Sequence, residues 1–147
     1  MFERLLESEA NLALTFLRIT LGMVMLPHGL QKLLGWFDGF GYRATMDFFG
    51  TMGIPSVIAF LIIVAESFGA FAMILGFCTR PAALGLFIVM VGAAFLQSKN
   101  GFFMNWYGNQ AGEGIEYHIL ILGICVGLIW AGAGAVSVDR WILDRLK

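Results

Sequence analysis

The residue of greatest chemical interest is Glu66, a carboxylate within an otherwise apolar stretch from Ser56 to Phe77. A bilayer core is about 30 Å thick and takes about 20 apolar helical residues to cross, so Glu66 is predicted near its middle. A charge at that depth is costly and must face a partner inside the protein. Arg18 and Glu66 differ in estimated depth by only about 7 Å at 1.5 Å per helical residue. We therefore predict an Arg18–Glu66 pair as a buried polar core, acting either as a structural pin or as a titratable ligand or proton site.

A second group of polar residues is predicted at the outer ends of two helices. His28 and Lys32 are four residues apart and share a helix face, whereas Glu116 and His118 open the last long apolar run. Together these four residues are expected to line an outer pocket. Histidines beside carboxylates can shuttle protons. The spacing matches no metal-binding motif, so no metal site is predicted; the alternative is a set of ordinary interfacial polar residues.

Two further features concern the inner face. Arg80 and Asp139 are expected to form a structural ion pair that ties a tight turn to the C-terminal helix. Cys78 and Cys125 differ in estimated depth by about 13 Å. A disulfide requires Cα atoms within about 7 Å, which argues against a dithiol–disulfide carrier.

These side chains need membrane-spanning helices to position them. The 147 residues are 59% hydrophobic and only 13% charged, against about 25% charged in a typical soluble domain. The composition therefore predicts an all-α integral membrane protein with the lipid bilayer as its partner, and the net charge of −1 gives no reason to expect nucleic acid. One domain, 1–147, is expected, with spans over 12–34, 56–77, 81–97 and 115–133 and a short amphipathic helix over 138–146.

The arrangement of the spans follows from turns, glycines and basic residues. The short turn before Pro81 makes the second and third spans antiparallel neighbours. Gly123 and Gly127 form a G-x-x-x-G pair, predicted as a packing seam in a four-helix bundle, with self-dimerisation as the alternative. Basic residues favour both termini inside. The inner set is Arg4, Arg18, Arg80, Arg140, Arg145 and Lys147, and the outer set is Lys32, Arg43 and Lys99.

Several of these residues also carry a resemblance. They are Arg18, the run from Pro27 to Phe37, Glu66 with Gly69, Gly76 to Arg80, Asn100 to Phe103, Glu116 with Tyr117, and Gly132 to Asp139. In this order and spacing, over nearly the whole chain, the sequence resembles the DoxX family of small four-helix bacterial membrane proteins. The resemblance implies an inner-membrane location. It also implies a redox role, because the family takes its name from a subunit associated with quinone-linked thiosulfate oxidation.

The function predicted from residues and resemblance together is a quinone-interacting or accessory subunit of a membrane oxidoreductase. Quinone is the cofactor that this role suggests, and the other subunits of a membrane redox complex would be its protein partners. The sequence itself contains no haem-ligand pair, cysteine cluster or nucleotide-binding loop that would fix a redox centre. The alternative is a non-enzymatic small transporter, channel or assembly partner whose buried charges hold its shape or gate a solute.

Overall fold

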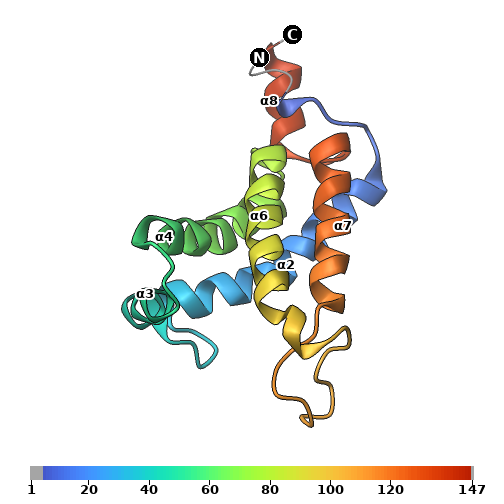
Figure 1. Ribbon diagram of the computed structural model, residues 1–147. Helices are drawn as coiled ribbons and strands as arrows, with labels where there is room; N and C mark the ends of the chain where they lie inside the picture. Colours follow the sequence, from blue (N-terminus) through green and yellow to red (C-terminus); the bar gives the residue numbers. More distant parts are fainter. Residues whose placement is uncertain (1–4, 147) are drawn as a thin grey trace.

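The computed structural model describes residues 5–146, and all the regular structure within them is helical (Figure 1). This confirms the predicted all-α class. Arg4 and Lys147, which were counted on the inner side, lie outside the described residues. The elements are α2 (Leu12–Leu34), α3 (Gly41–Thr51), α4 (Ser56–Val64), a π-helical turn (Ala65–Gly69), α5 (Ala70–Leu75), α6 (Thr79–Gln97), a 3-10 turn (Ser98–Asn100), α7 (Glu116–Ala131) and α8 (Val138–Leu146).

Three helical segments are long and apolar enough to cross a membrane, namely Leu12–Leu34, Ser56–Leu75 and Thr79–Asn100. They correspond to the first three predicted spans. Helix α7 is also apolar but has only 16 residues. At 1.5 Å per residue it is about 24 Å long, so the fourth span stays a prediction.

The long helices form two pairs that cross each other. Helix α2 packs along α5 and the π-helical turn, and α6 packs along α7. Figure 1 shows α6 and α7 running across α2 and α4 rather than alongside them. The helices of the predicted four-helix bundle are thus arranged as two crossed pairs. The second and third spans are neighbours, as predicted, because α6 contacts both α5 and the π-helical turn. They cross each other and do not run antiparallel as predicted (Figure 1).

The core lies where the two pairs cross, and every long helix contributes to it. Its buried members are Leu21, Met25, Ala70, Met73, Ala83, Leu86, Met90, Ile121, Cys125 and Leu128. Away from this crossing the helices expose large apolar side chains, including Phe16, Phe95 and Trp130. So much exposed apolar surface is typical of a protein whose outer faces are covered by lipid.

Close helix approach occurs at glycines other than those predicted. A Cβ on Gly22 would lie 2.7 Å from a backbone oxygen of α5, and one on Gly29 would overlap the backbone of Glu66. In contrast, Gly123 and Gly127 have nothing within 4 Å of an added Cβ. They line a surface groove of about 400 Å³ between α2 and α7. The prediction of a packing seam at Gly123 and Gly127 is therefore wrong within this chain.

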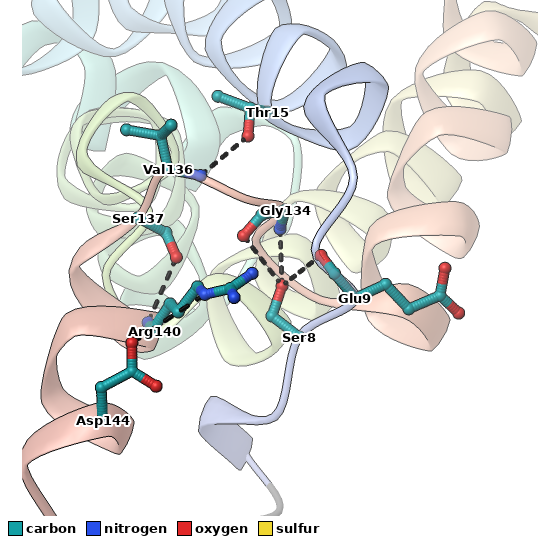
Figure 2. A network of polar contacts seen from close by, with 8 residues as sticks. All are labelled: Ser8, Glu9, Thr15, Gly134, Val136, Ser137, Arg140 and Asp144. Carbon is teal, nitrogen blue, oxygen red and sulfur yellow. Dashed lines mark hydrogen bonds and ion pairs between the residues drawn. The ribbon is translucent and has the colours of Figure 1, made fainter.

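The segment before α2 is fastened to the segment that leads into α8 (Figure 2). The Ser8 hydroxyl accepts a hydrogen bond from the Gly134 N–H at 2.6 Å and donates to the Gly134 carbonyl at 3.2 Å. The Val136 N–H donates to Thr15 Oγ1 at 3.3 Å. Ser137 accepts from the Arg140 N–H at 3.2 Å, as expected for a residue that caps a helix start. Residues near the two chain ends thus meet on one side of the molecule.

Candidate functional site

The carboxylate of Glu66 lies on the π-helical turn that interrupts the second apolar helix. Glu66 is 5% exposed, and the neighbouring Ser67 is also buried. The Ser67 hydroxyl has no hydrogen-bond partner among the described residues. Such turns hold an extra residue compared with an α-helix and frequently occur at functional sites. The sequence analysis located the buried glutamate but missed the π-helical turn, because only Ser67 and Gly69 hint at an irregular helix there.

The partner of Glu66 is Lys32. Its Nζ lies 2.5 Å from Glu66 Oε2, and the lysine side chain remains partly exposed whereas the carboxylate is buried. Gly29 explains the contact, because its missing side chain lets α2 approach the backbone of Glu66. Lys32 follows three residues later, one turn along the same helix, and its long side chain spans the remaining gap.

The predicted Arg18–Glu66 pair is therefore wrong, although both residues are buried. The depth estimate assumed that both helices begin level with the membrane surface. In the structure Gly29, and not a residue nearer Arg18, lies beside Glu66, so the two helices are shifted along each other. This shift brings the C-terminal part of α2 to the glutamate and leaves Arg18 near the C-terminal end of α5.

Arg18 binds main-chain carbonyls instead of a carboxylate. Its Nε donates to Ala133 at 2.9 Å, Nη1 donates to Ile74 at 2.7 Å and to Met73, and Nη2 donates to Val136 at 2.6 Å. The last carbonyls of a helix have no partner within it. At 1% exposure, the guanidinium thus joins the end of α5 to the segment before α8. We assign it a structural role.

The predicted outer ring divides into two parts. His28 lies near Tyr117, with ring centroids 6.5 Å apart, and Tyr117 lies 6.0 Å from His118. His118 is 8% exposed, and its Nδ1 has no hydrogen-bond partner among residues 5–146. The Tyr117 hydroxyl donates a long hydrogen bond of 3.8 Å to Met25 Sδ. Two histidines and a tyrosine thus form a row that begins on the helix carrying Lys32.

Glu116 takes no part in that row. Its Oε1 accepts from the Met104 N–H at 3.1 Å and from Trp106 Nε1 at 3.0 Å, so it organises the loop before α7. The four residues predicted to line one outer pocket therefore do not line the same pocket. Within the described part of the chain, no three His, Cys, Asp or Glu side chains lie close enough together to hold a metal.

A pocket of about 220 Å³ lies beside the ion pair, between the end of α2 and α3. It is lined by Gln31, Lys32, Asp38, Gly39, Phe40, Thr45, Phe48 and Phe49. Lys32 belongs both to this pocket and to the pair with Glu66. Three of the eight lining residues are phenylalanines, and the ammonium supplies hydrogen-bond donors at one edge. Nothing in the sequence pattern predicted this pocket.

The predicted Arg80–Asp139 contact also differs in the structure. Asp139 accepts from the N–H groups of Cys78 at 2.6 Å and Thr79 at 2.9 Å, whereas Arg80 donates to the carbonyls of Ile129 at 2.8 Å and Glu7 at 3.1 Å. The predicted Arg80–Asp139 pair is wrong because the first N–H groups of α6 need an acceptor and carry a partial positive charge. The carboxylate of Asp139 supplies that acceptor.

Cys78 and Cys125 are both free thiols. The contact with Asp139 predicts that Cys78 reacts slowly with alkylating reagents. Burial, reinforced by the negative charge of Asp139, raises the pKa of the Cys78 thiol. Only the thiolate reacts with alkylating reagents. In a Cys125→Ser background, we expect the labelling rate to keep rising above about pH 9, where an ordinary thiol with a pKa of about 8.5 levels off. Asp139→Asn should shift this profile to lower pH; an ordinary profile in the parent protein would contradict the assignment.

The fold and the site define a multi-helix membrane protein in which a buried carboxylate pairs with a partly exposed lysine beside a pocket that contains three phenylalanines. The family model of DoxX matches residues 13–99, more than half of the chain. This protein therefore belongs to the DoxX family, as the sequence analysis expected.

Three relatives show how far this likeness extends. The Bacillus subtilis protein named "Putative oxidoreductase CatD" is 27% identical over 131 residues, covering 89% of this chain and 87% of its own. Two Escherichia coli proteins named as inner membrane proteins are also similar: YphA is 28% identical over 84% of this chain and 85% of its own, and YqjF is 31% identical over 72% and 78%. No solved structure matches.

Proposed function

We propose that this protein binds the headgroup of a quinone in the pocket between α2 and α3, as a quinone-interacting or accessory subunit of a membrane oxidoreductase. The observation that carries the proposal is the position of Lys32, which lines that pocket and also pairs with the buried Glu66. A bound quinone would supply redox chemistry, and the electrons would come from a partner subunit.

The residues around the pocket suit such a headgroup. A quinone presents carbonyl oxygens at the edges of a flat ring, so its site needs hydrogen-bond donors and apolar walls. Lys32 Nζ and Gln31 provide donors, while Phe40, Phe48 and Phe49 provide the walls. Glu66 fixes the ammonium at the pocket edge through their 2.5 Å contact. The apolar outer surfaces of the helices leave a hydrocarbon tail in the lipid.

The proposed setting is the inner membrane of a bacterium, crossed four times with both termini inside. Support comes from the inner-membrane names of YphA and YqjF and from the three helices of spanning length. The proposed even number of crossings is supported by the hydrogen bonds between Ser8 and Gly134, which join the segment before α2 to the segment after α7. The redox part of the proposal draws further support from the name of CatD.

The test is to purify the protein in mild detergent, extract it and quantify bound quinone per chain. We expect about one quinone per folded chain in the parent protein. Lys32→Met should weaken quinone binding at least tenfold, which corresponds to a loss of about 1.4 kcal/mol of binding free energy. Lys99→Met is the matched control, because this lysine lies in the 3-10 turn, away from the pocket. It should retain quinone fully.

Glu66→Gln separates the chemical role from a purely architectural one. The proposal is supported if the variant accumulates in the membrane and has the unfolding temperature of the parent protein but binds no quinone. If the parent protein binds no quinone and Glu66→Gln fails to accumulate, the ion pair is architectural. The transporter, channel or assembly hypothesis then replaces this one.

A further inference from the structure

The length of α7 creates a mismatch with its neighbour. Helix α6 continues into the 3-10 turn, so Thr79–Asn100 has 22 residues and a length of about 33 Å. Helix α7 packs beside it but has 16 residues, about 24 Å. The hydrocarbon core is about 30 Å thick. If α7 crosses the membrane, another segment must cover the depth that it leaves open, and the only chain connecting the two helices is residues 101–115.

Part of the backbone of this connection is hydrogen-bonded within the connection or to the start of α7. The N–H groups of Ile115 and Glu116 donate to the carbonyls of Gly101 and Phe102 at 3.2 and 2.9 Å. The Asn105 side chain accepts from the Gln110 N–H at 3.0 Å and donates to the Gln110 carbonyl at 3.2 Å. Irregular backbone can enter a membrane only where its polar groups find partners within the protein. This connection meets that condition only in part, which suits the hydrated headgroup layer better than the hydrocarbon core.

The aromatic side chains of the same connection point outward. Trp106 is 77% exposed and Tyr107 is 90% exposed, and Phe102 and Phe103 are exposed as well. The Trp106 ring is held in place because its Nε1–H donates to Glu116. The single formal charge of residues 101–114 is on Glu113, whose carboxylate accepts from the Asn105 N–H at 2.9 Å. The outer surface of the connection is therefore aromatic and almost uncharged.

From these observations we infer that residues 101–114 form a membrane anchor, seated in the headgroup layer of the outer leaflet, that completes the short span of α7. Tryptophan and tyrosine concentrate at that level of a bilayer. The connection starts after the 3-10 turn that ends α6 and finishes at the start of α7. Its exposed aromatic surface therefore continues the lipid-facing surfaces of these two helices. The inference rests on the four-span arrangement of the proposed function but not on quinone binding.

Tryptophan fluorescence tests this placement. Trp36→Phe, Trp130→Phe and Trp141→Phe together leave Trp106 as the sole tryptophan. The protein is placed in phosphatidylcholine vesicles brominated either near the glycerol end or near the methyl end of one acyl chain, and aqueous iodide is added separately. We expect the largest loss of Trp106 emission with bromine near the glycerol end and little loss with iodide. A matched variant that retains only Trp130, an exposed residue near the other end of α7, reports whether the helix is inserted.

Two outcomes would overturn the inference. Strong quenching by iodide, with lipid bromine quenching only Trp130, would show that the connection lies in water. Protection from both quenchers that disappears on dilution with excess lipid would show a contact between protein copies instead. Neither outcome would affect the quinone measurement, so failure of the anchor is distinguishable from failure of the proposed function.

Discussion

Arg18→Met is expected to prevent accumulation of the folded protein in the membrane. The substitution removes a hydrogen-bond donor from four main-chain carbonyls. They are the carbonyls of Met73, Ile74, Ala133 and Val136. A buried polar group left unpaired costs about 1–3 kcal/mol. Even if only two of them lose their sole partner, the loss is a large part of the 5–15 kcal/mol that stabilises a typical domain. The measurement is membrane yield together with thermal unfolding of the purified fraction.

Arg18→Lys is the informative companion. It keeps the positive charge but replaces the planar fork of donors by one ammonium, which cannot bond to carbonyls on two sides in the same geometry. We expect intermediate stability if the hydrogen bonds matter. Equal stability of Arg18→Lys and the parent protein would show that charge alone is sufficient, and the structural role assigned above would then be wrong.

Gly29→Ala is expected to have the second large effect, because an added Cβ would overlap the backbone of Glu66 and Ser67. Backbone cannot rotate away as a side chain can, so α2 must move from the π-helical turn and the Lys32–Glu66 contact must lengthen. Overpacking of this kind costs about 1–3 kcal/mol, occasionally more. We expect a lower unfolding temperature and, if the proposed function is right, weaker quinone binding.

The matched control is Gly123→Ala, which adds the same methyl group to a helical glycine with open space around it. Alanine favours helix over glycine by about 1 kcal/mol, so this variant should be unchanged or slightly more stable. If Gly29→Ala behaved like Gly123→Ala, the close approach of α2 to Glu66 would be refuted. If Gly123→Ala alone were destabilising, the groove at Gly123 and Gly127 would be occupied in the membrane.

Sequence was sufficient for properties that depend on a single segment. The apolar runs predicted four spans, of which three are helices of spanning length in the structure. The one carboxylate inside such a run identified Glu66 as buried. Both inferences use only hydrophobicity and length, which are properties of one helix at a time. The resemblance to the DoxX family likewise depends on residue order, and the family model confirms it.

Pairings between segments were harder to predict, because each depends on how two helices are shifted along each other. The depth estimate treated the helices as level cylinders, whereas the approach at Gly29 sets the actual register and brings Lys32 to Glu66. The π-helical turn adds a further shift that no simple periodicity reveals. Gly29 three residues before Lys32 was the available signal, but glycine is too common in membrane helices to identify a contact by itself.

Main-chain groups account for the other errors. The sequence analysis matched Arg18 to Glu66 and Arg80 to Asp139 as opposite charges. In the structure both arginines donate to carbonyls, and Asp139 accepts from N–H groups at the start of α6. Helix ends carry unpaired donors and acceptors in every protein, but a sequence does not show which side chain reaches them. Predictions based on charge alone overlooked these competing partners.

The hydrogen bonds of Arg18 also impose an order on biosynthesis. Two of its acceptors, Ala133 and Val136, lie 115 and 118 residues further along the chain. The ribosome therefore delivers α2 to the membrane long before these carbonyls exist, and a growing chain must carry a guanidinium whose native partners are still missing. The hydrogen bonds of Arg18 can be completed only after the segment that contains Ala133 and Val136 has been made. Chains interrupted before Ala133 contain the apolar helices but lack two of the carbonyls that bind Arg18. Such chains therefore differ from longer ones in having a guanidinium without these two hydrogen-bond acceptors.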